Sequence, residues 1–291
     1  MQGRIAENKR NTVLIMTLFV GIIGVIAWVL VRFLGARPSI FYGVIGFAAI
    51  YAFLQYFFAD KLALMSSGAR QITQDDNPRL WNIVAQLAQK SMMPMPRVYI
   101  MHDPAPNAFA TGRDPRHAAV AATTGILEVM DDRELLAVFA HEMSHVKNYD
   151  IRVTMIAFGL TSIVSMLADL LLRMMIFGND DERSNGPLGM VVSLVVMILA
   201  PIVAMVIQMA VSRQREYLAD ASGAEMLHDS EGLARALEKL RDYGQPMQRQ
   251  NASTAHLFIA NPLSASMVAR LFSTHPPLDE RIERLRGANR G

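Results

Sequence analysis

The sequence contains no cysteine among its 291 residues. Disulfide bonds, iron–sulfur clusters and cysteine-ligated zinc are therefore excluded, and any bound metal has to be held by histidine, aspartate or glutamate. Charged residues are also few, at 19% of the chain, and the net charge is only +2. Because the chain lacks a dense block of lysine and arginine, we expect no nucleic-acid partner.

Apolar side chains, by contrast, are abundant: 52% of the residues are hydrophobic and the mean hydropathy is +0.23. That balance is typical of a protein with membrane-spanning segments. A helix needs about 20 apolar residues to cross a bilayer. Four stretches reach this length, at 13–34, 40–58, 153–172 and 188–211. The first is too long for the apolar core of a signal peptide, so we predict a retained membrane anchor.

Positive charges flank these stretches unevenly. Nine lysines and arginines lie on the side of the N-terminus and four on the opposite side. This bias predicts a multi-pass protein of the cell inner membrane with both termini in the cytosol. The chain then divides into a transmembrane hairpin (1–58), a first cytosolic part (59–152), a second transmembrane hairpin (153–211) and a second cytosolic part (212–291). We expect the two cytosolic parts to pack together as one domain beside the lipid bilayer.

The cytosolic parts carry signals of helices and of short strands. Asp131 or Asp132 is predicted to cap a helix, and Glu134, three residues after Asp131, would complete a capping box. Further helices are predicted to begin at Asn77 and at Ser230 and to cover 279–286, and strands are predicted at 97–101 and 117–124. These elements predict a mainly helical α+β domain.

The helix that follows Asp131 contains an H-E-x-x-H motif, His141-Glu142-x-x-His145. With about 3.6 residues per turn, the two histidines project from one face and can share one zinc ion. Glu142 lies beside that face, where it can take a proton from a water molecule in the site. The alternative is a polar helix face with two solvated histidines. Apolar sequence on both sides instead indicates a half-buried helix, in which these groups need partners.

A catalytic zinc site normally has a third protein ligand and one open position for water. Glu216 is the candidate, because the second hairpin returns the chain to the depth of the histidine pair. Asp220 follows on the same helical face and is placed to accept the second N–H of a ligand histidine. Taken alone, Glu216 could also be a surface carboxylate beside Arg213 and Arg215.

Several motifs occur together along the chain, between and after the two pairs of apolar stretches. They are Asn107-Ala108-Phe109-Ala110, His141-Glu142-x-x-His145 with Asp150, Glu216-Tyr217-x-x-Asp220, and Ser273-Thr274-His275-Pro276-Pro277 with Arg281. With these motifs, nearly the whole chain resembles the HtpX-type membrane zinc metalloproteases. That group is a branch of the family that includes the type I CAAX prenyl endopeptidases.

The resemblance implies one zinc ion per chain and a role for each motif. The zinc ligands would be His141, His145 and Glu216, with Glu142 as the general base.

Four other residues receive roles from the resemblance, each with an alternative. Asn107 would hold substrate backbone, or else form a local turn. His275 would face the developing oxyanion, or else only precede a helix. Asp150 would orient the metal-binding helix or cap it. Arg281 would pair with Asp220 or with another acid that supports the ligands, or else lie at the surface.

The resemblance further implies an α-helical integral membrane protein with four transmembrane helices and a mainly helical α+β, zincin-like cytosolic protease domain. Its expected substrates are unfolded, damaged or misassembled membrane proteins, in cooperation with other membrane proteases. An extended substrate could pair with the strand predicted at 117–124. Two alternatives stay open: a CAAX-type processing protease, and a catalytically silent quality-control scaffold. A scaffold would have no need of Glu142.

Overall fold

A computed structural model describes residues 2–34, 37–157, 159–160, 213–249, 257–261 and 276–287. Within this part, the chain forms two compact units. The first unit draws on Met1–Asn8, Asp60–Met155 and Val211–Gly291, and the second on Lys9–Ala59 and Ile156–Ala210. The first unit therefore gathers segments that are far apart in the sequence.

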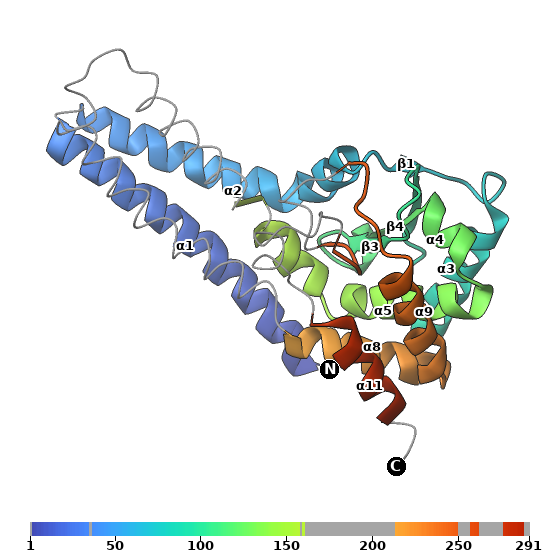
Figure 1. The fold of residues 1–291 in the computed structure, drawn as a ribbon. Helices are drawn as coiled ribbons and strands as arrows, with labels where there is room; N and C mark the ends of the chain where they lie inside the picture. The colour runs from blue at the N-terminus through green and yellow to red at the C-terminus, as the bar shows by residue number, and fades with distance from the viewer. Residues whose placement is uncertain are drawn as a thin grey trace, which may run out of the picture. The chain divides into compact units, whose positions relative to one another are not determined.

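Two long helices provide most of the described part of the second unit: α1 (Gln2–Leu34) and α2 (Pro38–Ser66) (Figure 1). Within the described residues, one helix, Phe41–Ser66, is long and apolar enough to cross a membrane. The predicted spans 13–34 and 40–58 lie in α1 and α2. The span 188–211 and most of 153–172 lie outside the described residues.

The first unit contains a four-stranded sheet in the order β1-β2-β4-β3. Strands β2 and β4 are parallel, and the two outer strands run antiparallel to their neighbours. The strands are β1 (Arg70–Gln71), β2 (Arg97–Met101), β3 (Ala108–Thr111) and β4 (Ala119–Thr123). The strand predicted at 97–101 is confirmed, whereas β3 was not predicted from the sequence.

The strand predicted at 117–124 is shorter than expected and has a different role. Residues Pro115–His117 form a 3₁₀ turn capped by the side chain of Asp114, and β4 begins only at Ala119. Because β4 is paired with β2 on one side and with β3 on the other, it has no open edge for a substrate strand. The expected substrate pairing with 117–124 was therefore wrong, and β3 is the edge strand next to β4.

The predicted helices of the first unit begin within one residue of the expected positions, whereas the short helix Thr124–Val129 was not predicted. Asn77 caps α3 through its side chain, and Asp131 and Glu134 form the predicted capping box of α5. Asp229 caps α9, the helix predicted to begin at Ser230. The helices are α3 (Pro78–Ser91), α4 (Thr124–Val129), α5 (Asp132–Lys147), α8 (Arg213–Leu227), α9 (Ser230–Asp242) and α11 (Leu278–Gly287).

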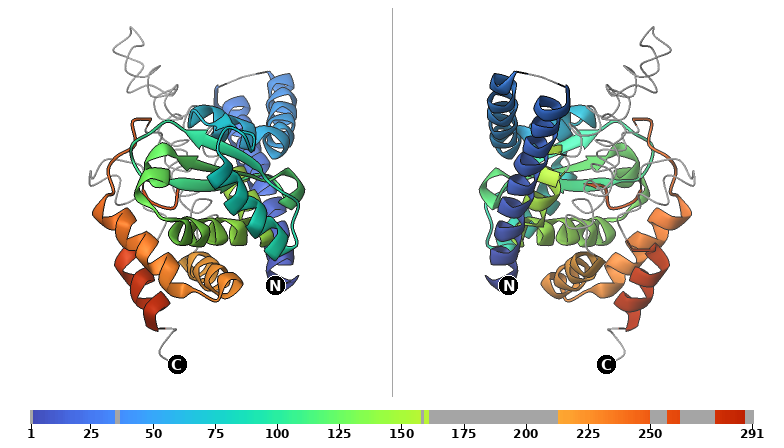
Figure 2. Two further views of the ribbon diagram at one scale, coloured as in Figure 1. Left: turned by 90° about the vertical axis from the view of Figure 1, so that its right-hand side faces the viewer. Right: turned by 90° about the vertical axis from the view of Figure 1, so that its left-hand side faces the viewer.

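Helix α5 lies at the centre of the first unit, between the sheet and helices α8 and α9 (Figure 2). It contacts β3, α3, α8 and α9. Leu135, Phe139 and Met143 are fully buried, as expected for a helix covered on several sides. The polar residues of the H-E-x-x-H motif are therefore held in a packed interior, where each of them needs a partner.

Candidate metal centre

Helix α5 buries the whole H-E-x-x-H motif. His141 is fully buried and Glu142 is 3% exposed, while the His145 side chain is 13% exposed. The two imidazoles lie one helical turn apart, and their Nε2 atoms are separated by 3.2 Å. The rings are nearly perpendicular, so both Nε2 atoms approach one point from different directions.

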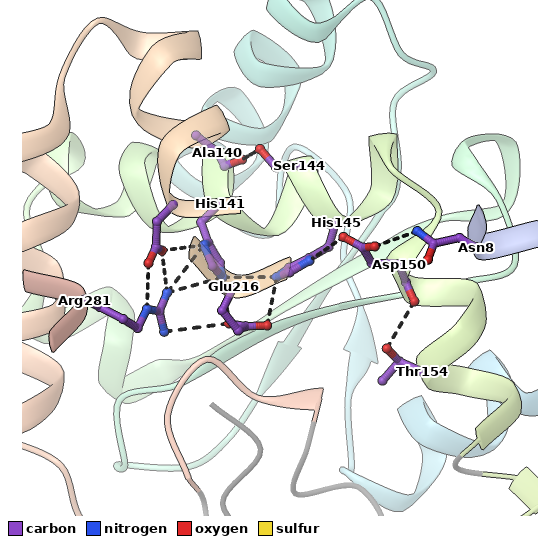
Figure 3. A network of polar contacts seen from close by, with 10 residues as sticks. Asn8, Ala140, His141, Ser144, His145, Asp150, Thr154, Glu216 and Arg281 are labelled. Atoms are coloured by element: carbon purple, nitrogen blue, oxygen red, sulfur yellow. Dashed lines mark hydrogen bonds and ion pairs between the residues drawn. The ribbon is translucent and has the colours of Figure 1, made fainter. Parts of the chain in front are cut away.

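Helix α8 brings Glu216 to the same point. Its carboxylate oxygens lie 3.7 Å from His141 Nε2 and 3.5 Å from His145 Nε2. The three side chains offer ligand atoms that all lie within 4.8 Å of one another. Figure 3 shows Glu216 facing both histidines across the gap between α8 and α5. The structure thus places together the three residues that the sequence suggested as ligands.

The spacing of these donor atoms fits a tetrahedral metal ion. Zinc binds histidine nitrogen at about 2.0–2.1 Å, so two ligand atoms at a tetrahedral zinc are about 3.4 Å apart. The two Nε2 atoms, 3.2 Å apart, are close to this value, and each of them lies 3.5–3.7 Å from one of the two Glu216 oxygens. Two imidazoles and one carboxylate are also a donor set that suits a divalent transition metal.

Each histidine contacts a carboxylate through Nδ1, the ring nitrogen that does not face Glu216. His141 Nδ1 lies 2.9 Å from Asp220 Oδ1, and His145 Nδ1 lies 3.1 Å from Asp150 Oδ2. With a proton on Nδ1, each ring donates to its carboxylate and presents Nε2 to Glu216. Asp220 and Asp150 therefore occupy the orienting positions that metal-binding histidines usually require.

Arg281 of α11 closes the site on the side of His141. Its guanidinium donates to both oxygens of Asp220, at 2.9 Å from Nε and 2.7 Å from Nη2. It also lies 3.9 Å from Glu216. Arg281 is completely buried, so the surface position considered from the sequence does not apply, and the arginine pairs with Asp220.

The electrostatic environments of the two histidines differ. Burial lowers the pKa of His141 to about 4, and Arg281 adds to this effect. Burial also acts to lower the pKa of His145, but the carboxylates of Glu216 and Asp150 outweigh it and raise that pKa to about 9. A proton is therefore stabilised on His145 and disfavoured on His141.

Glu142 lies beside the three donor side chains and is not one of them. It lines a small cavity together with His145, Glu216 and Ala110 of the edge strand β3. The cavity volume, about 40 Å³, is enough for at least one water molecule. A carboxylate in this place can exchange a proton with a water molecule next to the donor set.

The side chain of Asn107 binds backbone, although of this chain itself. Its amide donates to Ala260 O at 2.9 Å and accepts from Ala260 N at 3.2 Å. Next to it, Ile259 N donates to Ala108 O of β3 at 3.0 Å. The segment 257–261 therefore lies along the outer edge of β3. His275 lies outside the described residues.

Gly223 contributes to the site but was not singled out in the sequence. It lies on α8, seven residues after Glu216 and three after Asp220, and therefore on the same helical face. A Cβ atom added at this position would lie 2.9 Å from His141 N and 3.2 Å from Ala140 C. The absence of a side chain allows α8 to approach the backbone of α5 closely enough for Glu216 to reach the histidines. A glycine on the helix face that carries Glu216 and Asp220 was the available signal.

Gly223→Ala is expected to weaken metal binding about 10–100-fold, as do changes in the groups that orient metal ligands. The new methyl group meets backbone, which cannot yield as a flexible side chain can, so α8 has to move away from α5. Competition with a chromophoric chelator measures the affinity. Gly287→Ala is the matched control, because a Cβ atom at Gly287 meets no atom within 4 Å in the described structure. Equal affinities of the two variants would contradict the prediction.

The chain is similar to known proteins in its sequence and in its fold. The family model described as "Peptidase family M48" matches residues 74–289. A "Protease HtpX homolog" of Tropheryma whipplei (strain Twist) is 52% identical over 286 residues, which cover 98% of each chain. A homolog of the same name from Ligilactobacillus salivarius (strain UCC118) is 43% identical over 289 residues, covering 97% of this chain and 98% of the relative.

A solved structure, that of S. mikatae Ste24p, resembles the fold with a TM-score of 0.51 at 18% sequence identity. The match covers 97% of this chain and 66% of Ste24p, and it concerns the fold alone. The family model and the curated relatives, in contrast, span most or nearly all of the present sequence. The chain therefore belongs to peptidase family M48 and is a metalloprotease related to protease HtpX.

Proposed function

We propose that this protein is a zinc-dependent endopeptidase that cleaves misfolded or damaged membrane proteins at the cytosolic side of the cell inner membrane. The observation that carries the proposal is the donor set of His141, His145 and Glu216, whose ligand atoms lie close together, with Glu142 beside it. A silent scaffold would not require a buried carboxylate at the position of Glu142. We therefore favour the enzyme.

In this proposal His141, His145 and Glu216 hold one zinc ion per chain, and Asp220 and Asp150 fix the orientation of the two imidazoles. When bound, zinc supplies Lewis-acid chemistry that polarises the substrate carbonyl and makes water more acidic. The close spacing of the three donors supports this assignment.

Glu142 is the residue that moves protons. Its carboxylate takes a proton from the attacking water and passes it to the amine that leaves when the peptide bond breaks. We extend the proposal to His275 as a hydrogen-bond donor to the oxyanion that develops during attack. The burial of Glu142 supports its role, because it shields the proton transfer from bulk water.

Strand β3 is the proposed docking edge for substrate. Ala108 accepts Ile259 N–H on the side of β3 that faces away from β4. Because backbone groups point to alternate sides along a strand, Ala110 presents its N–H and C=O on that same side. Ala110 also lines the cavity that contains Glu142. Pairing through backbone groups requires an extended substrate but little sequence, which suits unfolded proteins.

Asn107 is the proposed second anchor for substrate backbone. In the structure its amide binds the N–H and the C=O of one residue, Ala260, in the manner that an extended peptide would use. A substrate held by Asn107 therefore has to take the place of the segment 257–261. This exchange would couple substrate binding to the release of that segment from β3.

The proposed membrane topology has four spans, with both termini and the active site in the cytosol. Exposed aromatic and aliphatic side chains on α2 support insertion, since soluble proteins rarely expose so many along one helix. Lipid would cover them in the cell. They include Tyr42 at 74% exposure, Phe47 at 61%, Ile50 at 61% and Phe53 at 60%.

Metal analysis of the detergent-purified protein tests this function. The wild type is expected to contain one zinc ion per chain and to cleave casein, whereas Glu216→Ala should lose most of both, because two imidazoles alone hold zinc weakly. Glu225→Ala replaces an exposed glutamate of the same helix and should behave as wild type. A wild type without zinc, or a Glu216→Ala variant with full zinc content, would refute the proposal.

A further inference from the structure

Near the N-terminus of the chain, the side chain of Asn8 contacts Asp150, which in turn contacts the histidine His145 of the donor set. Asn8 lies on α1 and belongs to the first unit, and it is only 5% exposed. Its amide nitrogen donates to Asp150 Oδ1 at 2.7 Å and to Asn148 O at 2.8 Å. These contacts join residues that are 140 and 142 positions apart in the sequence.

The same aspartate holds a histidine of the donor set. While Asp150 Oδ1 accepts from Asn8, Asp150 Oδ2 lies 3.1 Å from His145 Nδ1. Figure 3 shows Asn8, Asp150 and His145 in a row that ends at Glu216. The Asp150 carboxylate is thus bound through one oxygen by the Asn8 amide and through the other by the His145 imidazole.

The turn just before Asp150 has an unusual backbone conformation that these hydrogen bonds stabilise. Tyr149 has a φ of +63°, in the left-handed region that residues with a side chain rarely adopt. Asn8 binds on both sides of this residue, to the carbonyl of Asn148 and to the side chain of Asp150. The Asn8 amide therefore holds both the unusual backbone of the turn and the direction of the Asp150 carboxylate.

We propose that Asn8 is a positioning residue for the metal ligand His145 and that it acts through Asp150. The inference rests on the proposed function, in which His145 binds zinc. The removal of Asn8 takes a hydrogen-bond donor from a carboxylate that is only 7% exposed. Asp150 then loses its fixed orientation, and with it His145 loses its own.

Asn8 lies close in sequence to the first predicted membrane span. Asn8 is five residues before Val13, where the first predicted membrane span begins on the same continuous helix. The helix that anchors the protein would then also supply part of the support of the zinc site. Removal of the N-terminal segment that contains Asn8 would therefore lower the metal affinity.

Chelator competition on the full-length protein in detergent tests the inference. Asn8→Ala is expected to lower zinc affinity about 10–100-fold. Asn8→Asp should lower it further, because a second carboxylate would face Asp150. Asn11→Ala makes the same change three residues along the same helix, at a partly buried position, and should keep wild-type affinity. With casein as substrate, Asn8→Ala should reduce kcat more than it changes KM, since Asn8 supports the metal ligand.

A double-mutant cycle separates this role from a general effect on folding. In the Asp150→Ala background, Asn8→Ala should cause no further loss of zinc affinity, because the carboxylate through which Asn8 acts is already absent. An undiminished loss in that background would overturn the inference. So would an Asn8→Ala variant with wild-type affinity while the wild type binds zinc. A wild type that binds no zinc would refute the proposed function itself.

Discussion

Replacement of Glu142 by glutamine is expected to reduce the rate of peptide-bond cleavage about 10²–10⁴-fold, the contribution of a general base. Glutamine has nearly the same shape but cannot accept a proton from water at neutral pH. Because Glu142 lies beside the donor set of His141, His145 and Glu216, zinc binding should remain. The expected signature is therefore a zinc-loaded protein that does not cleave.

The measurement is the initial rate of casein cleavage together with the zinc content of the same preparation. Glu128→Gln, an exposed glutamate of α4, is the matched control and should retain full activity. If Glu142→Gln cleaved as fast as the control, another group would have to move the proton. A zinc-loaded wild type that cleaves no protein would instead favour the silent scaffold.

Most of the donor set could be predicted because it depends on the spacing of residues within short segments of sequence. The four-residue spacing of His141 and His145 fixes their common face once the segment is helical. Glu216 could be connected to them because a hydrophobic hairpin has to return to the side from which it starts. The resemblance suggested Arg281 as a partner of Asp220 or of another acid near the ligands, and the structure shows the contact with Asp220.

The sheet was harder to predict from sequence. The apolar run of β4, Ala119–Thr123, is typical of a strand buried on both faces, but it does not reveal which strands pair with it. Strand β3 has only four residues, Ala108–Thr111, too few for an alternating pattern to stand out. The edge of the sheet is set by long-range pairing, and the predicted docking strand was therefore the wrong one.

Asn8 and Gly223 were not found because their roles depend on contacts made in three dimensions. Asn8 lies in a polar segment before a predicted membrane span, with no spacing that relates it to Asp150. Gly223 shares a predicted helix face with Glu216 and Asp220, but the reason for a glycine there is the packing of α8 against the backbone of His141. Both residues support ligands and bind no metal themselves, and such support leaves little trace in local sequence.

Loss of the Arg281 side chain is expected to have the largest effect on stability. Arg281 is completely buried, and its guanidinium binds both oxygens of Asp220, which is 4% exposed. Asp220 has a pKa of about 2, because burial, which alone would raise this pKa, is outweighed by the charge of Arg281. Arg281→Met would leave a buried carboxylate without its cation. Breaking a buried ion pair in this way costs about 3–5 kcal/mol.

That loss corresponds to a fall of roughly 10 °C in the thermal midpoint, given about 2–4 °C per kcal/mol for domains of this size. Scanning calorimetry of the zinc-loaded protein measures it. Arg284→Met, on the same helix but in an exposed ion pair with Glu280, should leave the midpoint almost unchanged. The double variant Asp220→Asn/Arg281→Met should recover part of the loss, since it no longer buries an unpaired charge. If the single and double variants were equally unstable, the cost would lie in the lost packing of the arginine and not in its charge.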